Sequence, residues 1–282
     1  MSKTQRRWLI TGCSSGFGRE LAKAVLARGD RAVITARHTE SLQDLVSAYP
    51  DTAMAKALDL TKQESIPPFT RAVERSLGGV DVLVNNAGFG VLGAVEELTP
   101  EEYRPMFETN FFGTVELTRA LLPAMRERRS GHIVNVSSIA GVITRGAYGF
   151  YAATKFALEG VSEALAAELS PLGIHVTLVE PGPFRTDFAG RSLQLSRTVI
   201  EDYADTAGAS RAAISQRNGR QTGDPARAAA VILQAVDAEQ PPFRLPLGAF
   251  AHQRVREKVA ALEDALAWEA IAGKATEFPE QE

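Results

Sequence analysis

A tyrosine and a lysine four positions apart give the strongest chemical signal in this sequence. Tyr151 and Lys155 stand in the run YGFYAATK at 148–155, and residues four apart on a helix lie on one face of it. A phenol titrates near about 10 in water, and a cation beside it stabilises the phenolate and lowers its pKa toward the range useful at neutral pH. The pair is a candidate proton donor and acceptor, although the same spacing also fits a solvated helix face.

A hydroxyl side chain precedes the pair by the length of a loop. Ser137 and Ser138 follow the apolar run 132–136, and Ser138 stands thirteen residues before Tyr151. A loop and the first turn of a helix can bring two such residues together. We therefore expect the Ser138 hydroxyl to meet the Tyr151 phenol.

A glycine-rich turn near the N-terminus is the second chemical signal. Residues 11–18 read TGCSSGFG, between a strand-like run at 8–10 and a helix-like stretch at 19–28, and a second strand at 31–35 completes a βαβ unit. Small residues let the backbone approach a pyrophosphate, and the helix N-terminus offers N–H groups and a positive dipole to its charge. The pattern predicts a dinucleotide site, with a tight turn that binds no nucleotide as the alternative.

Length and composition restrict the class of protein. The chain has 282 residues, 45% of them hydrophobic, and a net charge of −3, so we expect one soluble α/β domain over residues 1–282 that does not bind nucleic acid. Cys13 is the only cysteine, which excludes an intrachain disulfide and a thiolate metal cluster, and we predict no metal site. No run of eighteen apolar residues is present, so we expect a cytoplasmic protein with no membrane partner.

Strands and helices are expected to alternate along the chain. Short β-branched runs predict further strands at 53–58, 80–84, 132–136 and 175–179. Longer amphipathic stretches with capping signals predict helices at 63–77, 101–128, 151–170 and 225–238. This order favours a Rossmann-type, doubly wound parallel sheet flanked by helices, with ligands beyond the carboxyl ends of the strands.

Two amides follow the fourth predicted strand. Asn85, Asn86, Ala87 and Gly88 follow residues 80–84. The amides can hydrogen-bond a cofactor, the neighbouring backbone, or both. A purely structural role for the two asparagines is the alternative.

Taken together, these motifs resemble the short-chain dehydrogenase/reductase family over residues 7 to about 248. The motifs are TGxxxGxG at 11–18, NNAG at 85–88, Asn110, Ser138, the Tyr151 and Lys155 pair, and PG at 181–182. The run PGPFRT at 181–186 looks more like the steroid- and retinol-dehydrogenase branch. The resemblance implies an oxidoreductase that interconverts a carbonyl and an alcohol by hydride transfer.

The resemblance also assigns catalytic roles. Tyr151 would be the general acid in reduction and the general base in oxidation, and Lys155 would lower its pKa and bind the nicotinamide ribose. Ser138 would hold and polarise the substrate oxygen. Asn110 matches an asparagine that interrupts a helix and holds a proton-relay water; a helix-interior asparagine turned to solvent is the alternative.

Cofactor binding is assigned in the same way. The residues concerned are Gly12, Ser14, Ser15, Gly16, Phe17, Gly18, Arg37, Asp59, Leu60, Asn86, Ala87, Gly88, Tyr151, Lys155, Pro181, Gly182, Phe184 and Thr186. In the family, the Pro-Gly turn and a threonine such as Thr186 hold the nicotinamide carboxamide.

One position argues for the phosphorylated cofactor. Relatives that prefer NAD carry an acidic residue at the end of the second strand, where this chain has Ala36 followed by Arg37. A guanidinium without a neighbouring carboxylate favours a 2′-phosphate, so NADP(H) is predicted over NAD(H). Two alternatives remain. Arg37 could be an ordinary surface residue, and Asp59, which matches the aspartate on the adenine side of the cofactor in the family, could instead cap the next helix.

The segment 184–222 is expected to form a lid over an apolar substrate. It carries Phe184, Phe188, Leu193, Leu195, Ile200 and Tyr203, which could equally be core residues of two short helices. Rim residues expected from elsewhere are Phe89, Val91, Ile139, Val142 and Tyr148. We predict a hydrophobic ketone, aldehyde or secondary alcohol, while Arg185 and Arg191 leave an anionic substrate open.

The C-terminal part adds an edge strand at 241–247 and a helical extension at about 250–282. Apolar residues recur at helical spacing at Val255, Val259, Leu262, Leu266 and Trp268. The extension can pack on its own subunit or on a neighbour. A homodimer, built in relatives on the helices that contain Asn110 and Tyr151, or a homotetramer is expected.

Three rival functions remain at this point. The chain could be an NAD-dependent alcohol dehydrogenase of the same family, a non-catalytic dinucleotide sensor, or a structural interaction protein. A sensor or a structural protein should have lost some of the proton-transfer residues, and all of them are present.

Overall fold

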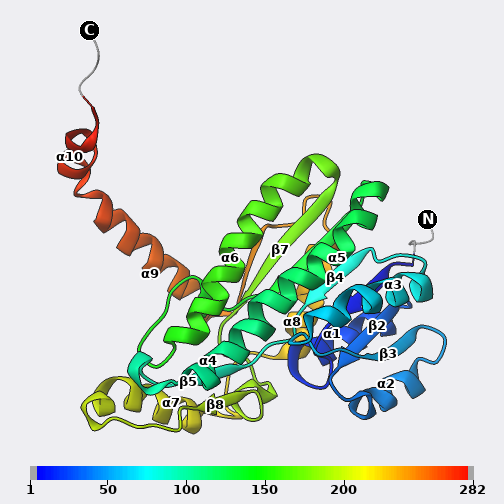
Figure 1. Ribbon diagram of the computed structural model, residues 1–282, viewed down its shortest axis with the longest axis horizontal. Helices are drawn as coiled ribbons and strands as arrows, with labels where there is room; N and C mark the ends of the chain where they lie inside the picture. The colour runs from blue at the N-terminus through cyan, green and yellow to red at the C-terminus, as the bar shows by residue number, and fades with distance from the viewer. Residues whose placement is uncertain (1–4, 279–282) are drawn as a thin grey trace.

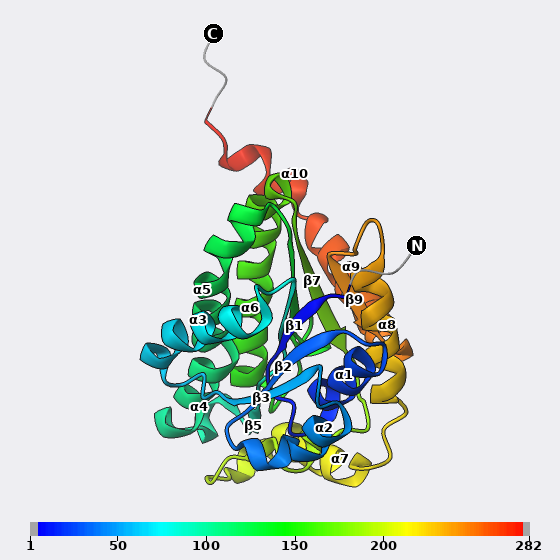
Figure 2. The ribbon, with the colours of Figure 1, turned by 90° about the vertical axis from the view of Figure 1, so that its right-hand side faces the viewer.

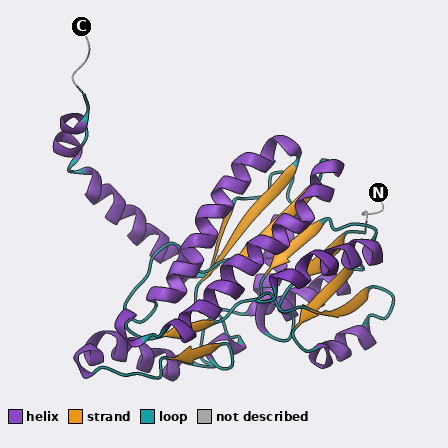
Figure 3. Cartoon of the chain, in the orientation of Figure 1, coloured by secondary structure: helices purple, strands orange, loops and turns teal. Residues whose placement is uncertain are grey.

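The computed structural model describes residues 5–278; residues 279–282 of the predicted C-terminal extension, like residues 1–4, lie outside the described residues. A parallel sheet of seven strands forms the centre (Figures 1 and 3), in the order β3-β2-β1-β4-β6-β7-β9. Its strands are β1 (Arg7–Ile10), β2 (Arg31–Ala36), β3 (Ala53–Ala57), β4 (Val82–Asn85), β6 (Gly131–Val136), β7 (Ile174–Pro181) and β9 (Arg244–Leu247). The predicted Rossmann-type sheet is confirmed.

Helices cover both faces of the sheet. They are α1 (Gly16–Ala27), α2 (Gln43–Ala48), α3 (Ile66–Leu77), α4 (Pro100–Phe107), α5 (Gly113–Arg128), α6 (Gly149–Leu169), α7 (Ala209–Arg217), α8 (Pro225–Asp237), α9 (Ala249–Leu266) and α10 (Glu269–Ala272). Figure 2 shows α1, α2 and α8 on one side of the sheet and α3, α5 and α6 on the other.

The alternation of side chains along each strand creates the two cores. In β1, Trp8 and Ile10 pack with α1 and α8, whereas Leu9 packs with α3 and α5 on the opposite face. Both faces are covered, so the strands read as continuous apolar runs. The strand order reverses between β1 and β4, and at such a switch point the loops after the strands separate and leave a crevice for a ligand.

Some elements differ from the sequence-based expectations. The predicted helix 101–128 is divided by a π-helix at Glu108–Phe112. Two short strands, β5 (Gly90–Leu92) and β8 (Leu193–Leu195), pair in parallel outside the main sheet. The helix α2 was also not predicted. Each missed strand has three residues, which is too short for an alternating pattern to be read.

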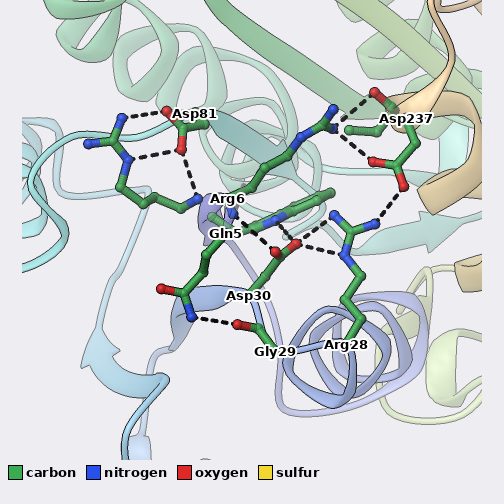
Figure 4. Close-up of polar contacts among 10 residues, drawn as sticks. Gln5, Arg6, Arg28, Gly29, Asp30, Asp81 and Asp237 are labelled. Atoms are coloured by element: carbon green, nitrogen blue, oxygen red, sulfur yellow. Dashed lines mark hydrogen bonds and ion pairs between the residues drawn. The ribbon is translucent and has the colours of Figure 1, made fainter. Parts of the chain in front are cut away.

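A polar cluster ties the first strand to the helix layer of α1 and α8 at the amino end of the sheet (Figure 4). The Asp30 carboxylate accepts from the Arg6 N–H at 3.0 Å, the Trp8 Nε1–H at 2.9 Å and the Arg28 Nε–H at 2.6 Å. Arg28 also bonds Asp237 at the end of α8, at 2.9 Å. This cluster is structural, because it lies at the end of the sheet opposite to the crevice.

No helix within residues 5–278 is both long and apolar enough to cross a membrane.

Candidate active site

A cavity of about 560 Å³ opens at the carboxyl ends of the strands. Its walls come from the β1–α1 turn, the ends of β2, β3, β4, β6 and β7, the start of α6, and the segment 184–222. Every residue that the sequence assigned to the cofactor lines this cavity except Gly18. The predicted site residues other than Gly18 and Asn110 therefore share one cavity.

The glycine turn has the geometry that a pyrophosphate needs. Gly12 and Gly16 have φ of +70° and +60°, and a Cβ on Gly12 would lie 2.8 Å from the Ala87 Cα. Helix α1 then begins without an acidic residue in its first turn and without a side-chain cap from Ser15. Its first N–H groups and positive dipole therefore face the cavity, which fits a bound diphosphate.

Gly18 has a packing role instead. It does not line the cavity, and a Cβ there would lie 2.5 Å from the Gly12 carbonyl oxygen. The third glycine of the motif thus lets α1 approach the turn closely. Its contact with the cofactor stays a prediction, whereas its packing against the turn is a property of the structure.

The two asparagines at the end of β4 hold the scaffold. Asn86 Nδ2 donates to the carbonyls of Thr11 at 2.8 Å and Gly12 at 3.0 Å, and the Thr11 hydroxyl accepts from the Asn86 N–H at 2.9 Å. Asn85 Nδ2 donates to Thr118 and Asn135 in the core. Asn86 also lines the cavity, so it joins the turn to the site. Sequence reasoning missed Thr11, whose hydroxyl fixes this corner.

Ser138, Tyr151 and Lys155 converge on the cavity. The Ser138 hydroxyl lies close enough to the Tyr151 phenol to lower its pKa, in agreement with the approach expected from their thirteen-residue separation. Ser138 Oγ also accepts from the Ala140 N–H at 3.1 Å, which fixes its side chain after β6. Hydroxyl and phenol therefore present their oxygens together to one point of the wall.

Burial shifts the pKa of both members of the pair. Burial raises the pKa of Tyr151 to about 12, although the hydrogen bond from Ser138 acts to lower it. Lys155 Nζ donates to the Val136 carbonyl at 2.8 Å, and burial lowers its own pKa to about 8. Desolvation is the largest effect on the phenol, and the lowering of its pKa by Lys155 stays a prediction.

A carboxylate lies one helical turn beyond Lys155. The charge of Glu159 raises the pKa of Lys155 against the effect of burial. Glu159 is itself buried, and it is paired with Arg244 Nη1 at 2.5 Å, which also binds Glu180 at 2.6 Å. Sequence reasoning missed this group of charges behind the active site.

Asn110 is buried rather than turned to solvent. Its Oδ1 accepts from the Phe89 N–H at 3.0 Å, and its Nδ2 donates to the Phe89 carbonyl at 2.8 Å and to Thr154 at 3.1 Å. It lies in the π-helix, as an asparagine that interrupts a helix should. The side chain does not line the cavity, so it positions the loop after β4 against α6. Its role in holding a water stays a prediction.

Arg37 is available to a ligand at the adenosine end of the cavity. It is exposed, it lines the cavity, and within residues 5–278 no hydrogen bond or ion pair holds its guanidinium. Asp59 lies nearby: burial acts to raise its pKa, but bonds from Thr61 and the charges of Lys62 and Arg37 lower it. Asp59 Oδ1 accepts from the Thr61 N–H and hydroxyl in a local turn. Asp59 is not the N-cap of the next helical segment, because Lys62 occupies that position.

The other half of the cavity is apolar. Phe89, Ile139, Tyr148 and Phe188 line it as predicted, with the Phe188 ring centroid 5.4 Å from that of Tyr151. The lining residues that sequence reasoning missed include Ile143, Thr144, Arg145, Ile214, Arg217, Phe250 and Arg254.

Four residues expected near the substrate need correction or restriction. Val91 is buried in β5 and does not line the cavity, nor does Val142. Arg185 also lies outside the lining and donates to the Gln221 carbonyl at 3.2 Å. Arg191 lines the cavity, but it is paired with Asp187 at 2.5 Å.

Two carboxylates hold the segment 184–222, the predicted lid. Glu97 Oε1 accepts from the Ile200 N–H at 2.9 Å, and its other oxygen pairs with Arg211 in the interior. Glu102 Oε1 accepts from the Arg197 N–H at 3.0 Å. The lid is therefore anchored through backbone N–H groups, to which carboxylates bind strongly.

Comparison with known proteins agrees with this geometry. Residues 6–195 match the family model described as short chain dehydrogenase. The chain is 40% identical over 241 residues to a 3-ketodihydrosphingosine reductase of Bacteroides thetaiotaomicron, covering 85% of this chain and 87% of the relative. It is 41% identical over 200 residues to retinol dehydrogenase 8 of Homo sapiens, covering 68% of this chain and 63% of the relative. A solved short-chain dehydrogenase of Streptomyces avermitilis is 45% identical with a TM-score of 0.92, covering 98% of this chain and 100% of that one.

Proposed function

The chain belongs to the short-chain dehydrogenase/reductase family of NAD(P)-dependent oxidoreductases acting on CH–OH groups, and we propose that it uses NADP(H) to interconvert a hydrophobic ketone or aldehyde and its alcohol. The observation that carries the proposal is the meeting of Ser138, Tyr151 and Lys155 in the cavity that also holds the glycine turn and Arg37.

The cofactor residues fit a phosphorylated dinucleotide. The turn at Gly12 and Gly16 and the start of α1 would bind the pyrophosphate. Arg37 would pair with a 2′-phosphate, and the preceding residue is Ala36, so no carboxylate at that position repels the phosphate. Lys155 would bind the nicotinamide ribose. When bound, NADPH supplies the hydride for the carbonyl carbon.

The chain's own residues move the proton. In reduction the Tyr151 phenol gives its proton to the substrate oxygen as negative charge develops there, and in oxidation the phenolate takes it back. Ser138 donates a hydrogen bond to the same oxygen. The Tyr151 phenol is protonated at neutral pH, so it can donate its proton in reduction. Lys155, charged below its pKa of about 8, stabilises the phenolate as it forms.

The lining supports an apolar substrate. Phe89, Ile139, Phe188 and Ile214 surround the space next to Tyr151, and an apolar wall favours a substrate that leaves little polar surface to desolvate. The relative from Bacteroides thetaiotaomicron is a ketone reductase by its name. We therefore expect ketones with long aliphatic or polycyclic bodies to react fastest.

The test is steady-state reduction of aliphatic, aryl and steroid ketones and aldehydes with NADPH and with NADH. Tyr151→Phe should lower kcat by about 100-fold or more, while Tyr148→Phe, whose ring lines the same cavity, should retain most activity. Arg37→Ala should raise the KM for NADPH about tenfold without changing that for NADH. Arg71→Ala, an exposed arginine on α3, is the matched control.

Each contrary outcome would favour a different function. Equal use of NADH by the wild type, unchanged in Arg37→Ala, would favour an NAD-dependent alcohol dehydrogenase. Tight NADPH binding without turnover on any carbonyl would favour a dinucleotide sensor. Failure to bind either cofactor would refute the proposal altogether.

A further inference from the structure

The second half of the last long helix of the chain has almost no contact with the rest of the molecule. Helix α9 starts beside β9 at the edge of the sheet and then projects away from it together with α10 (Figure 1). Ala251 is the only buried residue of α9, and every residue of 259–266 is exposed. Isolated helices of this length are marginal in water and gain most of their stability from packing an apolar face. The face of α9 therefore needs a partner.

That face is a continuous apolar stripe. Val255, Val259, Leu262 and Leu266 are spaced by four, three and four residues, the repeat that places side chains along one seam of a coiled coil. The exposed fractions of the large apolar side chains are 49% for Val259, 53% for Leu262, 67% for Leu266, 65% for Trp268 and 62% for Ile271. Large apolar side chains gathered in this way mark an interaction surface.

The charges along the helix are separated by sign. The first half, 249–258, carries Arg254, Arg256 and Lys258 against the single carboxylate Glu257. The following residues, 259–272, carry three carboxylates and neither lysine nor arginine. A helix that is basic in its first half and acidic in its second half is complementary to a reversed copy of itself.

We propose that α9 pairs antiparallel with α9 of a second copy of this chain. When Val259 faces the partner's Leu262, the same register places Val255 against the partner's Leu266. All four layers of the seam are then apolar. The pairing is closed by twofold symmetry, so each contact occurs twice.

The register also matches the charges. Arg256 and Glu263 occupy the same flank of the seam, one heptad apart. In the antiparallel pair, Arg256 lies next to the partner's Glu263, and Glu263 lies next to the partner's Arg256. Opposite helix dipoles add to this preference.

Parallel pairing is disfavoured by the shape of the molecule. Paired helices lie about 8 to 10 Å apart, and each α9 emerges directly from the body of its own subunit (Figures 1 and 2). Parallel pairing would bring both bodies to the same end of the pair, where they would overlap. Antiparallel pairing places them at opposite ends.

The pairing would reach the active site. Phe250 and Arg254, in the first turns of α9, line the cavity. The register directs the chain after Leu266, with Trp268 and Ile271, toward the partner's Phe250. Assembly would therefore hold the first turns of α9 in the cavity wall of each subunit.

The mass in solution tests the proposal. Wild type, Leu262→Asp and Ala261→Asp are compared by light scattering between about 1 and 100 µM, a range in which weak interfaces titrate. Both substitutions add the same charge to an exposed position, but only Leu262 lies on the stripe. We expect Leu262→Asp to halve the assembled mass and raise the KM for ketone, and Ala261→Asp to do neither. Unchanged far-UV circular dichroism of the body and unchanged NADPH binding show that the fold is retained.

A charge exchange tests the orientation. Arg256→Glu or Glu263→Arg alone should weaken the assembly, and the double variant should restore it. A wild type that is monomeric at all concentrations would overturn the proposal. So would an assembled Leu262→Asp with the wild-type mass, or a double variant no stronger than Glu263→Arg alone. These results do not depend on which cofactor or substrate the enzyme uses.

Discussion

The charge on Lys155 is set by two opposing effects within one turn of α6. Burial lowers its pKa to about 8, and the Glu159 carboxylate acts against that shift. Burial in turn raises the pKa of Glu159, while Ser137, Arg244 and Lys155 act to lower it. Because Lys155 must be charged to stabilise a phenolate, the pH range of catalysis should depend on a residue outside the cavity lining.

We expect Glu159→Gln to move the alkaline limb of the pH profile of kcat for ketone reduction to lower pH. Lysine is charged below its pKa, so losing the neighbouring negative charge lowers that pKa and the cation disappears earlier as pH rises. The measurement is kcat against pH from about 6 to 10, with a cofactor concentration that saturates the enzyme at each pH.

Glu163→Gln is the matched control. Glu163 binds the same Arg244 at 2.5 Å and lies on the same helix, but it is exposed and does not contribute to the pKa of Lys155. Its profile should coincide with that of the wild type. An equal displacement in both variants would assign the effect to Arg244 rather than to Lys155, and no displacement in Glu159→Gln would contradict the role of its charge.

At the residue scale, spacing predicted the pairs that are close in sequence. Tyr151 and Lys155 share one helix face, and Ser138 needed only a short loop to reach the phenol. The partners that come from distant segments were not predictable. Glu159 and Arg244 are separated by 85 residues, and only the pairing of β7 with β9 brings them together.

At the scale of elements, the segment 184–222 is fixed to the body by the connection between β5 and α4 and by the first turn of α4. Glu97 pairs with Arg211 of α7, and both Glu97 and Glu102 accept backbone N–H groups of the lid. The lid also supplies β8, which pairs with β5. Since Phe188 and Leu193 of this segment line the cavity, the anchoring should govern substrate binding more than chemistry.

We expect Glu97→Gln to raise the KM for ketone by about tenfold, because Arg211 loses its charged partner and a hydrogen bond to a charged group is worth about 1.5 to 3 kcal/mol. The kcat and the affinity for NADPH should change little. Trypsin should cleave faster within 197–220, the lid segment that carries four arginines. Steady-state kinetics and timed proteolysis measure the two effects.

Glu101→Gln on α4 serves as the control, because Glu101 is exposed and bonds Thr99 rather than the lid. It should match the wild type in both assays. A Glu97→Gln enzyme whose kcat falls while its KM stays constant would mean that the ion pair acts on the catalytic residues instead of on the lid.

Element type was predictable where the segment is long. The strands of the main sheet and helices α3, α6 and α8 were predicted within a few residues, because their periodic patterns span many positions. The π-helix at Glu108–Phe112 was not predicted as a π-helix, because it depends on tertiary contacts. The Asn110 side chain points inward and hydrogen-bonds Phe89 and Thr154. Likewise, β8 exists because β5 lies beside it.

At the scale of the whole molecule, the sheet is secured at the end away from the active site. The cluster around Asp30 (Figure 4) joins the start of β1, the end of α1 and the end of α8. Arg28 also stacks over the Trp8 ring, with its Cζ 5.3 Å from the ring centroid. The residues that stabilise the sheet and the residues of the active site thus lie at opposite ends of the same strands. A substitution at one end can therefore change stability without changing catalysis.

We expect Asp30→Ala to destabilise the protein by about 3 kcal/mol, because it leaves the buried Trp8 Nε1–H unpaired and removes the carboxylate that neutralises Arg28. The midpoint of thermal unfolding should fall by about 6 to 12 °C, while kcat and KM at 25 °C stay at wild-type values. Asp44→Ala, which breaks the exposed pair with Arg19, should leave the midpoint unchanged. If Asp30→Ala unfolded at the wild-type temperature, the cluster would contribute nothing to stability. If it lost activity while still folded, the two ends of the sheet would be coupled, and the separation of stability from catalysis along these strands would be wrong.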